Sequence, residues 1–239
     1  AGGHNAPPRG PRAVDERGQP VYGPRDEANL AAVAATGLPF WLAGGFGGPE
    51  KLAEARTAGA TGVQVGSAFA LCDESGLAPD LKHRAIDAAL RGDLEVRTDG
   101  RASPTGFPFK IAELDGTLAD PDLLDARRRV CDLGYLRTPY RRDDGTIGYR
   151  CPGEPQGAYV RKGGDLEDTV GRVCLCNCLL AAIGHGQRRR AGDERPVVTF
   201  GAEVPALVVE LAAATGSYRA ADVVARILGG AGSGPVAEP

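Results

Sequence analysis

Two short apolar stretches, each ending in glycine, constrain the fold more than any other feature of this chain. "LPFWLAGG" at 38–45 has the length and composition of a strand buried on both faces, and "TGVQVGSAF" at 61–69 is predicted to form a second short strand. Helical patterns precede the first stretch at about 27–36, separate the two from Pro49 onward, and follow the second at 78–92. This alternation is typical of a parallel sheet with helices outside it, and it predicts an α/β fold.

The alternation ends near residue 95. Residues 96–200 are rich in Gly, Pro, Arg and Asp, with possible short strands at 145–151 and 158–163. Two helices are predicted near the end, at 205–216 and 217–230, the second with Ser217 as its N-cap. We therefore expect a domain at 1–95 and an irregular α+β extension at 96–239, whose terminal helices pack on the first domain.

Charge and hydropathy exclude several classes of function. The formal net charge of -3 offers no basic excess for binding nucleic acid. No stretch approaches the ~20 apolar residues that a membrane span needs, and no signal peptide is visible. The six cysteines in 239 residues are too few for a disulfide scaffold. These features predict a cytoplasmic protein.

Small residues follow both predicted strands, at the edge where parallel sheets bind ligands. Gly44 and Gly45 leave backbone amides exposed, and the helix that begins near Pro49 directs its positive end toward them. Gly66 and Ser67 end the next strand, and in (β/α)8 barrels the last two strands often bind phosphate. The pair predicts a phosphate site, while each turn taken alone is also explained by a need for positive φ.

A histidine stands among the first residues, in "AGGHN". The glycines before His4 allow the chain to pass close to a flat ligand. A neutral imidazole, with a pKa near ~6.5, is suited to removing a carbon-bound proton at neutral pH. His4 is a candidate catalytic base, and a structural or surface histidine is the alternative.

These motifs together resemble a known family. "AGGHN", "PFWLAGGFG" and "GVQVGSAFALCDES", followed by "VRTDGRASPTGFPFK", resemble the FMN-dependent nitronate monooxygenases over about residues 1–110. The resemblance implies a partial (β/α)8 TIM barrel that contains the last two strands and helices. It further implies that this chain is the C-terminal portion of a longer enzyme whose N-terminal half is missing, and that the isolated piece is inactive.

The resemblance also implies roles for individual residues. His4 would be the catalytic base, and Gly2 and Gly3 would lie along the flavin. The residues expected to hold the FMN phosphate and ribityl chain are Gly44, Gly45, Gln64, Val65, Gly66 and Ser67.

The implied activity is FMN-dependent oxidation of nitroalkanes or alkyl nitronates by O2, which yields a carbonyl compound and nitrite. The expected partners are thus a small nitro compound, O2 and the missing half of the barrel. An alternative with the same fold and cofactor is a flavin-dependent enoyl reductase of fatty-acid or polyketide synthesis. A third hypothesis makes the cysteine-rich region a docking module and the barrel segment an inactive remnant.

Five of the six cysteines lie in the irregular extension, three of them in "CLCNC". Four thiolates bind Zn²⁺ tetrahedrally, and a metal would stabilise a segment with little apolar core. The candidate ligands of a structural zinc are Cys131, Cys151, Cys174 and Cys176. Buried free thiols are the alternative, because cysteine is often a small core residue.

Overall fold

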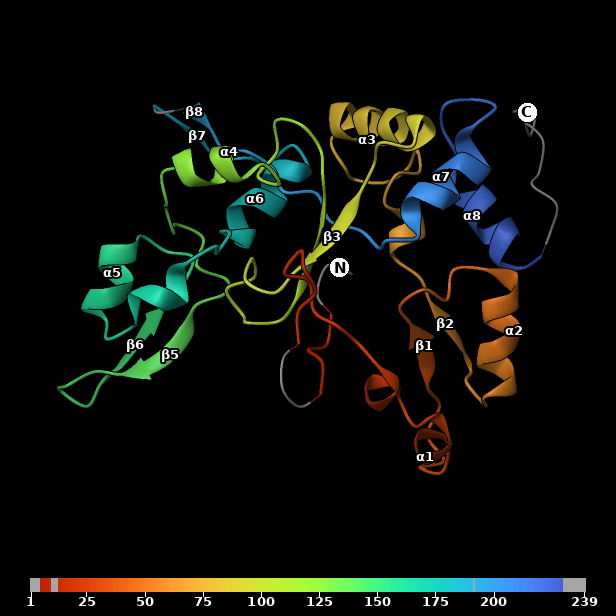
Figure 1. Ribbon diagram of the computed structural model, residues 1–239, viewed down its shortest axis with the longest axis horizontal. Helices are drawn as coiled ribbons and strands as arrows, with labels where there is room; N and C mark the ends of the chain where they lie inside the picture. Colours follow the sequence, from red (N-terminus) through yellow and green to blue (C-terminus); the bar gives the residue numbers. More distant parts are fainter. Residues whose placement is uncertain (1–4, 10–12, 191, 230–239) are drawn as a thin grey trace. The chain divides into compact units, whose positions relative to one another are not determined.

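The chain forms two compact units, shown by a computed structural model that describes residues 5–9, 13–190 and 192–229 (Figure 1). Among the described residues, the first unit contains 23–95 and 200–229, and the second contains 5–22 and 96–199. The chain passes from the first unit to the second after Glu95. The expected ranges 1–95 and 96–239 differ from the units because 200–229 join the first unit and 5–22 join the second.

A parallel strand pair with a helical crossover is the centre of the first unit. Strand β1 (Trp41–Ala43) pairs with β2 (Gly62–Gln64), with Trp41 opposite Gly62 and Ala43 opposite Gln64. Helix α2 (Pro49–Thr57) joins them and begins with proline in its first turn, as predicted. The expected burial on both faces is wrong: the Trp41 side chain is 55% exposed, because in the described part of the chain the sheet has only these two strands.

The remaining helices of the first unit pack beside this pair. Helix α3 (Pro79–Arg91) is confirmed and ends at Gly92 in the left-handed conformation. It packs against α7 (Val204–Ala212), and α8 (Ala220–Ile227) packs against α2 (Figure 1). The terminal helices therefore pack on the βαβ elements, as expected. The other helical elements of this unit are α1 (Leu30–Ala34) and the short 3-10 helices η1 (Pro24–Asp26) and η2 (Ser67–Phe69).

One predicted helix cap is wrong. The N-cap of α8 is Arg219 rather than Ser217. The Ser217 hydroxyl instead makes a hydrogen bond to the Asp73 carboxylate at 3.4 Å. The backbone amide of Arg219 donates to the Asp222 side chain at 2.8 Å, which closes the first turn without a serine.

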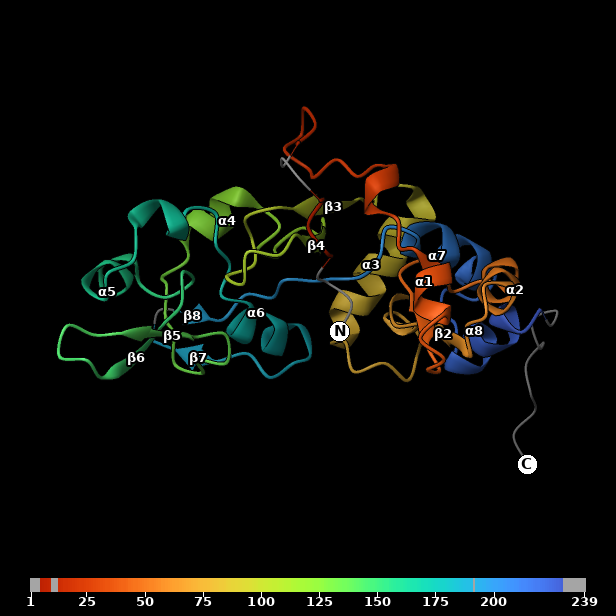
Figure 2. The same cartoon turned by 90° about the horizontal axis from the view of Figure 1, so that it is seen from below.

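Three antiparallel hairpins and three short helices form the second unit (Figure 2). The hairpins are β3 (Val96–Asp99) with β4 (Phe109–Ala112), β5 (Thr138–Arg141) with β6 (Ile147–Arg150), and β7 (Arg188–Arg189) with β8 (Gly192–Asp193). The helices are α4 (Pro121–Ala126), α5 (Gln156–Arg161) and α6 (Leu175–Ala182), with the 3-10 turn η3 (Leu166–Thr169).

The core of the second unit contains Phe109, Ile111 and Leu118, packed against Leu175 and Cys178 of α6. The strand predicted at 158–163 is wrong, since these residues lie in α5 and the turn after it. Pro155 precedes the first turn of that helix, and a proline there favours a helix start over a strand.

The sheets formed by the described residues have two strands each, and none closes into a barrel. The structure therefore shows a mixed α/β protein with one parallel strand pair in its first unit. Across residues 5–9, 13–190 and 192–229, no helix combines the length and apolar character needed to cross a membrane.

Candidate functional site

The turns that follow β1 and β2 line a single pocket, of about 300 Å³, which we call the strand-end pocket. The candidate cofactor residues that line it are Gly44, Gly45, Gln64, Val65, Gly66 and Ser67. The structure therefore brings together six residues that sequence reasoning grouped. The other three candidates, Gly2, Gly3 and His4, lie outside the described residues.

The backbone of the first turn requires glycine. Gly44 and Gly45 have φ values of 85° and 84°, a region that residues with a Cβ rarely adopt. The space beside both Cα atoms is open, so a Cβ would meet backbone strain rather than a clash. Outside the sheet ladder, the amides of Gly45, Gly66 and Ser67 have no hydrogen-bond partner among the described residues. These are the donors that an anion in the pocket would use.

Ser67 also connects the pocket to the C-terminal segment. Its hydroxyl oxygen accepts a hydrogen bond from the Gly201 amide at 2.8 Å. Because the oxygen acts as acceptor in this bond, the hydroxyl hydrogen stays available to a ligand. Ser67 thus both holds residue 201 in place and keeps one donor for the pocket.

Sequence reasoning missed Glu203, which lines the same pocket and is the N-cap of α7. Its carboxylate lies over Gly201, so close that a Cβ there would clash with it. Glu203 is separated from the glycine turns by more than a hundred residues, and nothing in "FGAEVP" marks it as a pocket residue. The pocket therefore combines uncharged donors with one carboxylate.

The cysteines proposed as zinc ligands lie in the second unit as free thiols. Burial raises the pKa of Cys151 to about 11, with smaller contributions from the nearby Cys131, Cys174 and Cys176. Within the described residues, however, no three His, Cys, Asp or Glu side chains are placed to hold a metal ion, so the expected zinc site is not found. One reason is visible at Cys174, whose thiol is directed at the Val130 carbonyl, 3.6 Å away.

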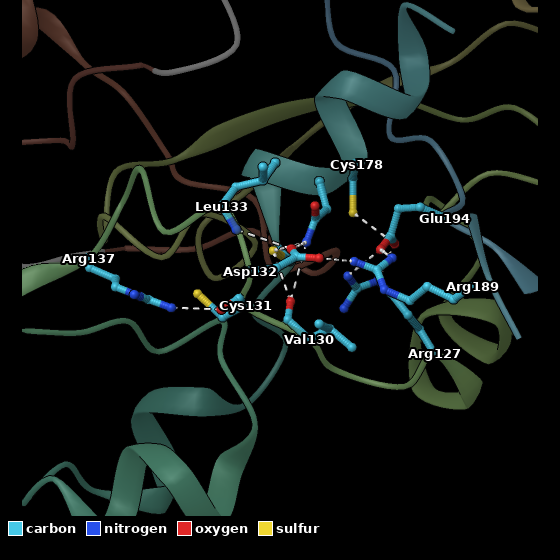
Figure 3. Close-up of polar contacts among 11 residues, drawn as sticks. Arg127, Val130, Cys131, Asp132, Leu133, Arg137, Cys178, Arg189 and Glu194 are labelled. Atoms are coloured by element: carbon cyan, nitrogen blue, oxygen red, sulfur yellow. Dashed lines mark hydrogen bonds and ion pairs between the residues drawn. The ribbon is translucent and has the colours of Figure 1, made fainter. Parts of the chain in front are cut away.

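Beside these thiols lies an ion network, centred on the buried Glu194 and Arg127, that sequence reasoning also missed (Figure 3). Arg127 donates twice to the Glu194 carboxylate, at 2.6 and 2.9 Å, and Arg189 donates to the same carboxylate at 3.0 Å. Arg189 also pairs with Asp132 at 2.5 Å, and Asn177 of α6 donates to Asp132 at 2.8 Å. Burial opposes ionisation of Asp132, but the hydrogen bonds from Asn177 and Arg189 outweigh it and lower its pKa.

The fold and the strand-end pocket first define a class: an α/β protein with a pocket lined by glycine turns at the carboxyl ends of two parallel strands. A sequence model of the family described as nitronate monooxygenase matches residues 1–104. Residues 1–104 are thus similar to this family, which confirms the resemblance noted from the motifs.

One curated relative is 42% identical over 72 residues: the (3aS,4S,5R,7aS)-5-hydroxy-7a-methyl-1-oxo-octahydro-1H-indene-4-carboxyl-CoA dehydrogenase of Mycobacterium tuberculosis (strain ATCC 25618 / H37Rv). The match covers 30% of this chain and 20% of the relative, so this chain spans only a fifth of the relative's length. No solved structure matches this chain.

Proposed function

We propose that this protein is a flavin-dependent oxidoreductase that binds FMN with its phosphate in the strand-end pocket. The observation that carries the proposal is that the turn at Gly44 and Gly45 and the turn at Gly66 and Ser67 line one pocket. The family match at residues 1–104 supports the same assignment. In this proposal β1 and β2 are the last two strands of a (β/α)8 barrel.

The pocket offers a phosphate group two kinds of hydrogen-bond donor, backbone amides and a hydroxyl, and one carboxylate that restricts where the phosphate can lie. Backbone amides at Gly45, Gly66 and Ser67 are unpaired outside the sheet ladder, and the Ser67 hydroxyl has a hydrogen to donate. The Glu203 carboxylate would repel a phosphate placed beside it. We therefore assign the phosphate to the amides of the two turns, and the carboxylate to the hydroxyl groups of the ribityl chain, which donate hydrogen bonds.

For the reaction, we propose oxidation of nitroalkanes or alkyl nitronates by O2 to a carbonyl compound and nitrite. FMN, when bound, supplies the redox chemistry. In its neutral form, His4 takes the α-proton from the carbon that bears the nitro group, and a substrate that arrives as the nitronate anion does not need this step. Gly2 and Gly3 allow the backbone to approach the flat ring of the flavin.

A matched pair of glycine variants tests the cofactor assignment. Gly37 and Gly45 both have positive φ and open space around a built Cβ, so alanine adds the same backbone strain at either position. Gly45 lines the strand-end pocket and Gly37 does not. Flavin fluorescence titrations should show at least about tenfold weaker FMN binding for Gly45→Ala and unchanged binding for Gly37→Ala. Equal FMN affinities in the two variants would contradict the assignment.

A second pair of measurements tests the reaction. Nitrite release should occur from nitroalkanes and from nitronates without any nicotinamide cofactor. In the full-length enzyme, His4→Asn should abolish turnover of neutral nitroalkanes and spare most of the nitronate reaction, because only the neutral substrate needs a base. Equal loss with both substrates would refute the role of His4 as base.

A different substrate class is favoured by the curated relative, which is named as a carboxyl-CoA dehydrogenase. That name gives no support to the enoyl-reductase alternative, since a dehydrogenase oxidises its substrate. The second candidate is therefore flavin-dependent oxidation of a CoA thioester. Substrate-dependent flavin bleaching by a CoA thioester, without nitrite release from any nitro compound, would select it. The cytoplasmic location and the docking-module hypothesis stay predictions.

A further inference from the structure

A second pocket, in the second unit, is lined by an unusual number of arginines. It has a volume of about 410 Å³, within the range of small-molecule sites, and lies between α4 and the β7–β8 hairpin. Its arginines are Arg127, Arg128, Arg189, Arg190 and Arg195. We call it the arginine pocket, and it shares no residue with the strand-end pocket.

The ion pairs within the pocket leave positive charge unbalanced. Arg127 and Arg189 pair with the buried Glu194 (Figure 3). Arg195 donates to the Gly116 carbonyl and has no carboxylate partner among the described residues. Arg128 and Arg190 have no hydrogen-bond or ion-pair partner in the described part of the chain.

The acidic side of the pocket does not balance these cations. Asp193 is the other carboxylate that lines the pocket, and its side chain has no partner among the described residues either. The cations without a carboxylate partner therefore exceed the free carboxylates, and a dianion would restore the balance.

The pocket wall is held in place before any ligand binds. Glu194 is 4% exposed and accepts hydrogen bonds from Arg127 and Arg189, which holds the residue that follows the β7–β8 hairpin in place. Arg189 is held from its other side by Asp132. Arg128 and Arg190 lie on this fixed wall beside Arg127 and Arg189, and the planar donor set of a guanidinium group matches phosphate oxygens.

The pocket is not lined by charge alone. Leu123 and Ala126 of α4, together with Val130, contribute apolar surface to the same wall. A bare inorganic ion would leave this apolar surface exposed to water. A phosphate ester that carries an organic group would cover it and satisfy the arginines at once.

We propose that the arginine pocket binds a phosphorylated small molecule, and that Arg128 and Arg190 bind its dianionic phosphoryl group. The site is independent of the flavin-dependent chemistry proposed above, so either assignment can fail without the other.

Isothermal titration calorimetry at low salt with inorganic phosphate, adenosine 3′,5′-bisphosphate and adenosine tests the proposal. The bisphosphate should bind at least about tenfold more tightly than inorganic phosphate, and uncharged adenosine should not bind measurably. Equal affinity for inorganic phosphate and the bisphosphate would overturn the assignment to an organic ester. If neither inorganic phosphate nor the bisphosphate binds, the proposal that the arginine pocket is a binding site is wrong.

Variants separate the pocket from general electrostatic attraction. Arg128→Gln and Arg190→Gln should each weaken bisphosphate binding about tenfold, because each removes a charge-assisted donor. Arg188→Gln is the matched control, since Arg188 lies on β7, is exposed and does not line the pocket. Asp193→Asn should strengthen binding about threefold by removing the opposing carboxylate. A loss for Arg188→Gln as large as for Arg190→Gln would overturn the proposal.

Discussion

Replacing Glu194 by glutamine should destabilise the second unit strongly. The Glu194 and Arg127 side chains are only 4% and 9% exposed and meet through two hydrogen bonds, while Arg189 donates a third. Glutamine keeps the shape but leaves the buried Arg127 without its carboxylate, while Arg189 keeps only its pair with Asp132. Removing one partner of a buried pair costs about 3–5 kcal/mol. A Coulomb estimate at 4 Å with an effective dielectric constant near 20 gives about 4 kcal/mol, which agrees.

Hydrogen exchange followed by mass spectrometry measures this change within the second unit. Peptides that cover α6 and the β7–β8 hairpin should exchange about a thousandfold faster in Glu194→Gln, the factor that corresponds to about 4 kcal/mol. Glu167→Gln is the matched control, because the Arg101–Glu167 pair has a similar distance of 2.9 Å but is 60% and 76% exposed. That change should cost less than about 1 kcal/mol. Similar exchange rates in the two variants would refute the argument from burial.

Three further outcomes are expected. Lys82→Met should destabilise the first unit by about 2–3 kcal/mol in urea unfolding, because the ammonium group of Lys82 donates to the carbonyls of Cys72, Asp73 and Ser75. Phe109→Ala should cost about 3–5 kcal/mol in the same assay, since Phe109 is 1% exposed in the core of the second unit. Folding raises the pKa of Cys151 to about 11. The neutral thiol therefore adds to the free energy of unfolding below the unfolded-state pKa near ~8.5, and this stabilisation is lost as pH rises toward 11. The free energy of unfolding should fall more steeply above pH 9 in the wild type than in Cys151→Ala.

Local sequence signals were sufficient for the elements around the strand-end pocket. Proline in the first turn and glycine just past the end mark α2 and α3, and both helices begin where these signals predict. The two glycine turns meet because each follows a strand of one parallel pair, which is a consequence of the βα alternation. Burial of the strands could not be predicted from their apolar character, because it depends on which neighbours the sheet has.

The features that sequence reasoning missed depend on contacts between distant residues. Arg127 and Glu194 are 67 positions apart, and each stands in a stretch that reads as an ordinary solvated loop. Glu203 reaches the strand-end pocket only because the C-terminal segment returns to the first unit, where the Gly201 amide meets Ser67. No periodicity or local motif encodes such a return of the chain. For the cysteines, sequence reasoning left two interpretations open, a metal site and buried free thiols, and the burial of Cys151, Cys174 and Cys178 fits the second.

The two pockets offer different chemistry to an anion, and this difference separates their ligands. The strand-end pocket presents uncharged amides and a hydroxyl beside the Glu203 carboxylate, so affinity there depends on hydrogen-bond geometry. The arginine pocket presents guanidinium groups without carboxylate partners, so affinity there depends on charge. Salt screens the second kind of binding far more than the first, because exposed charges interact over about a Debye length. Raising the salt concentration should therefore release a phosphate ester from the arginine pocket while FMN stays bound at the strand ends.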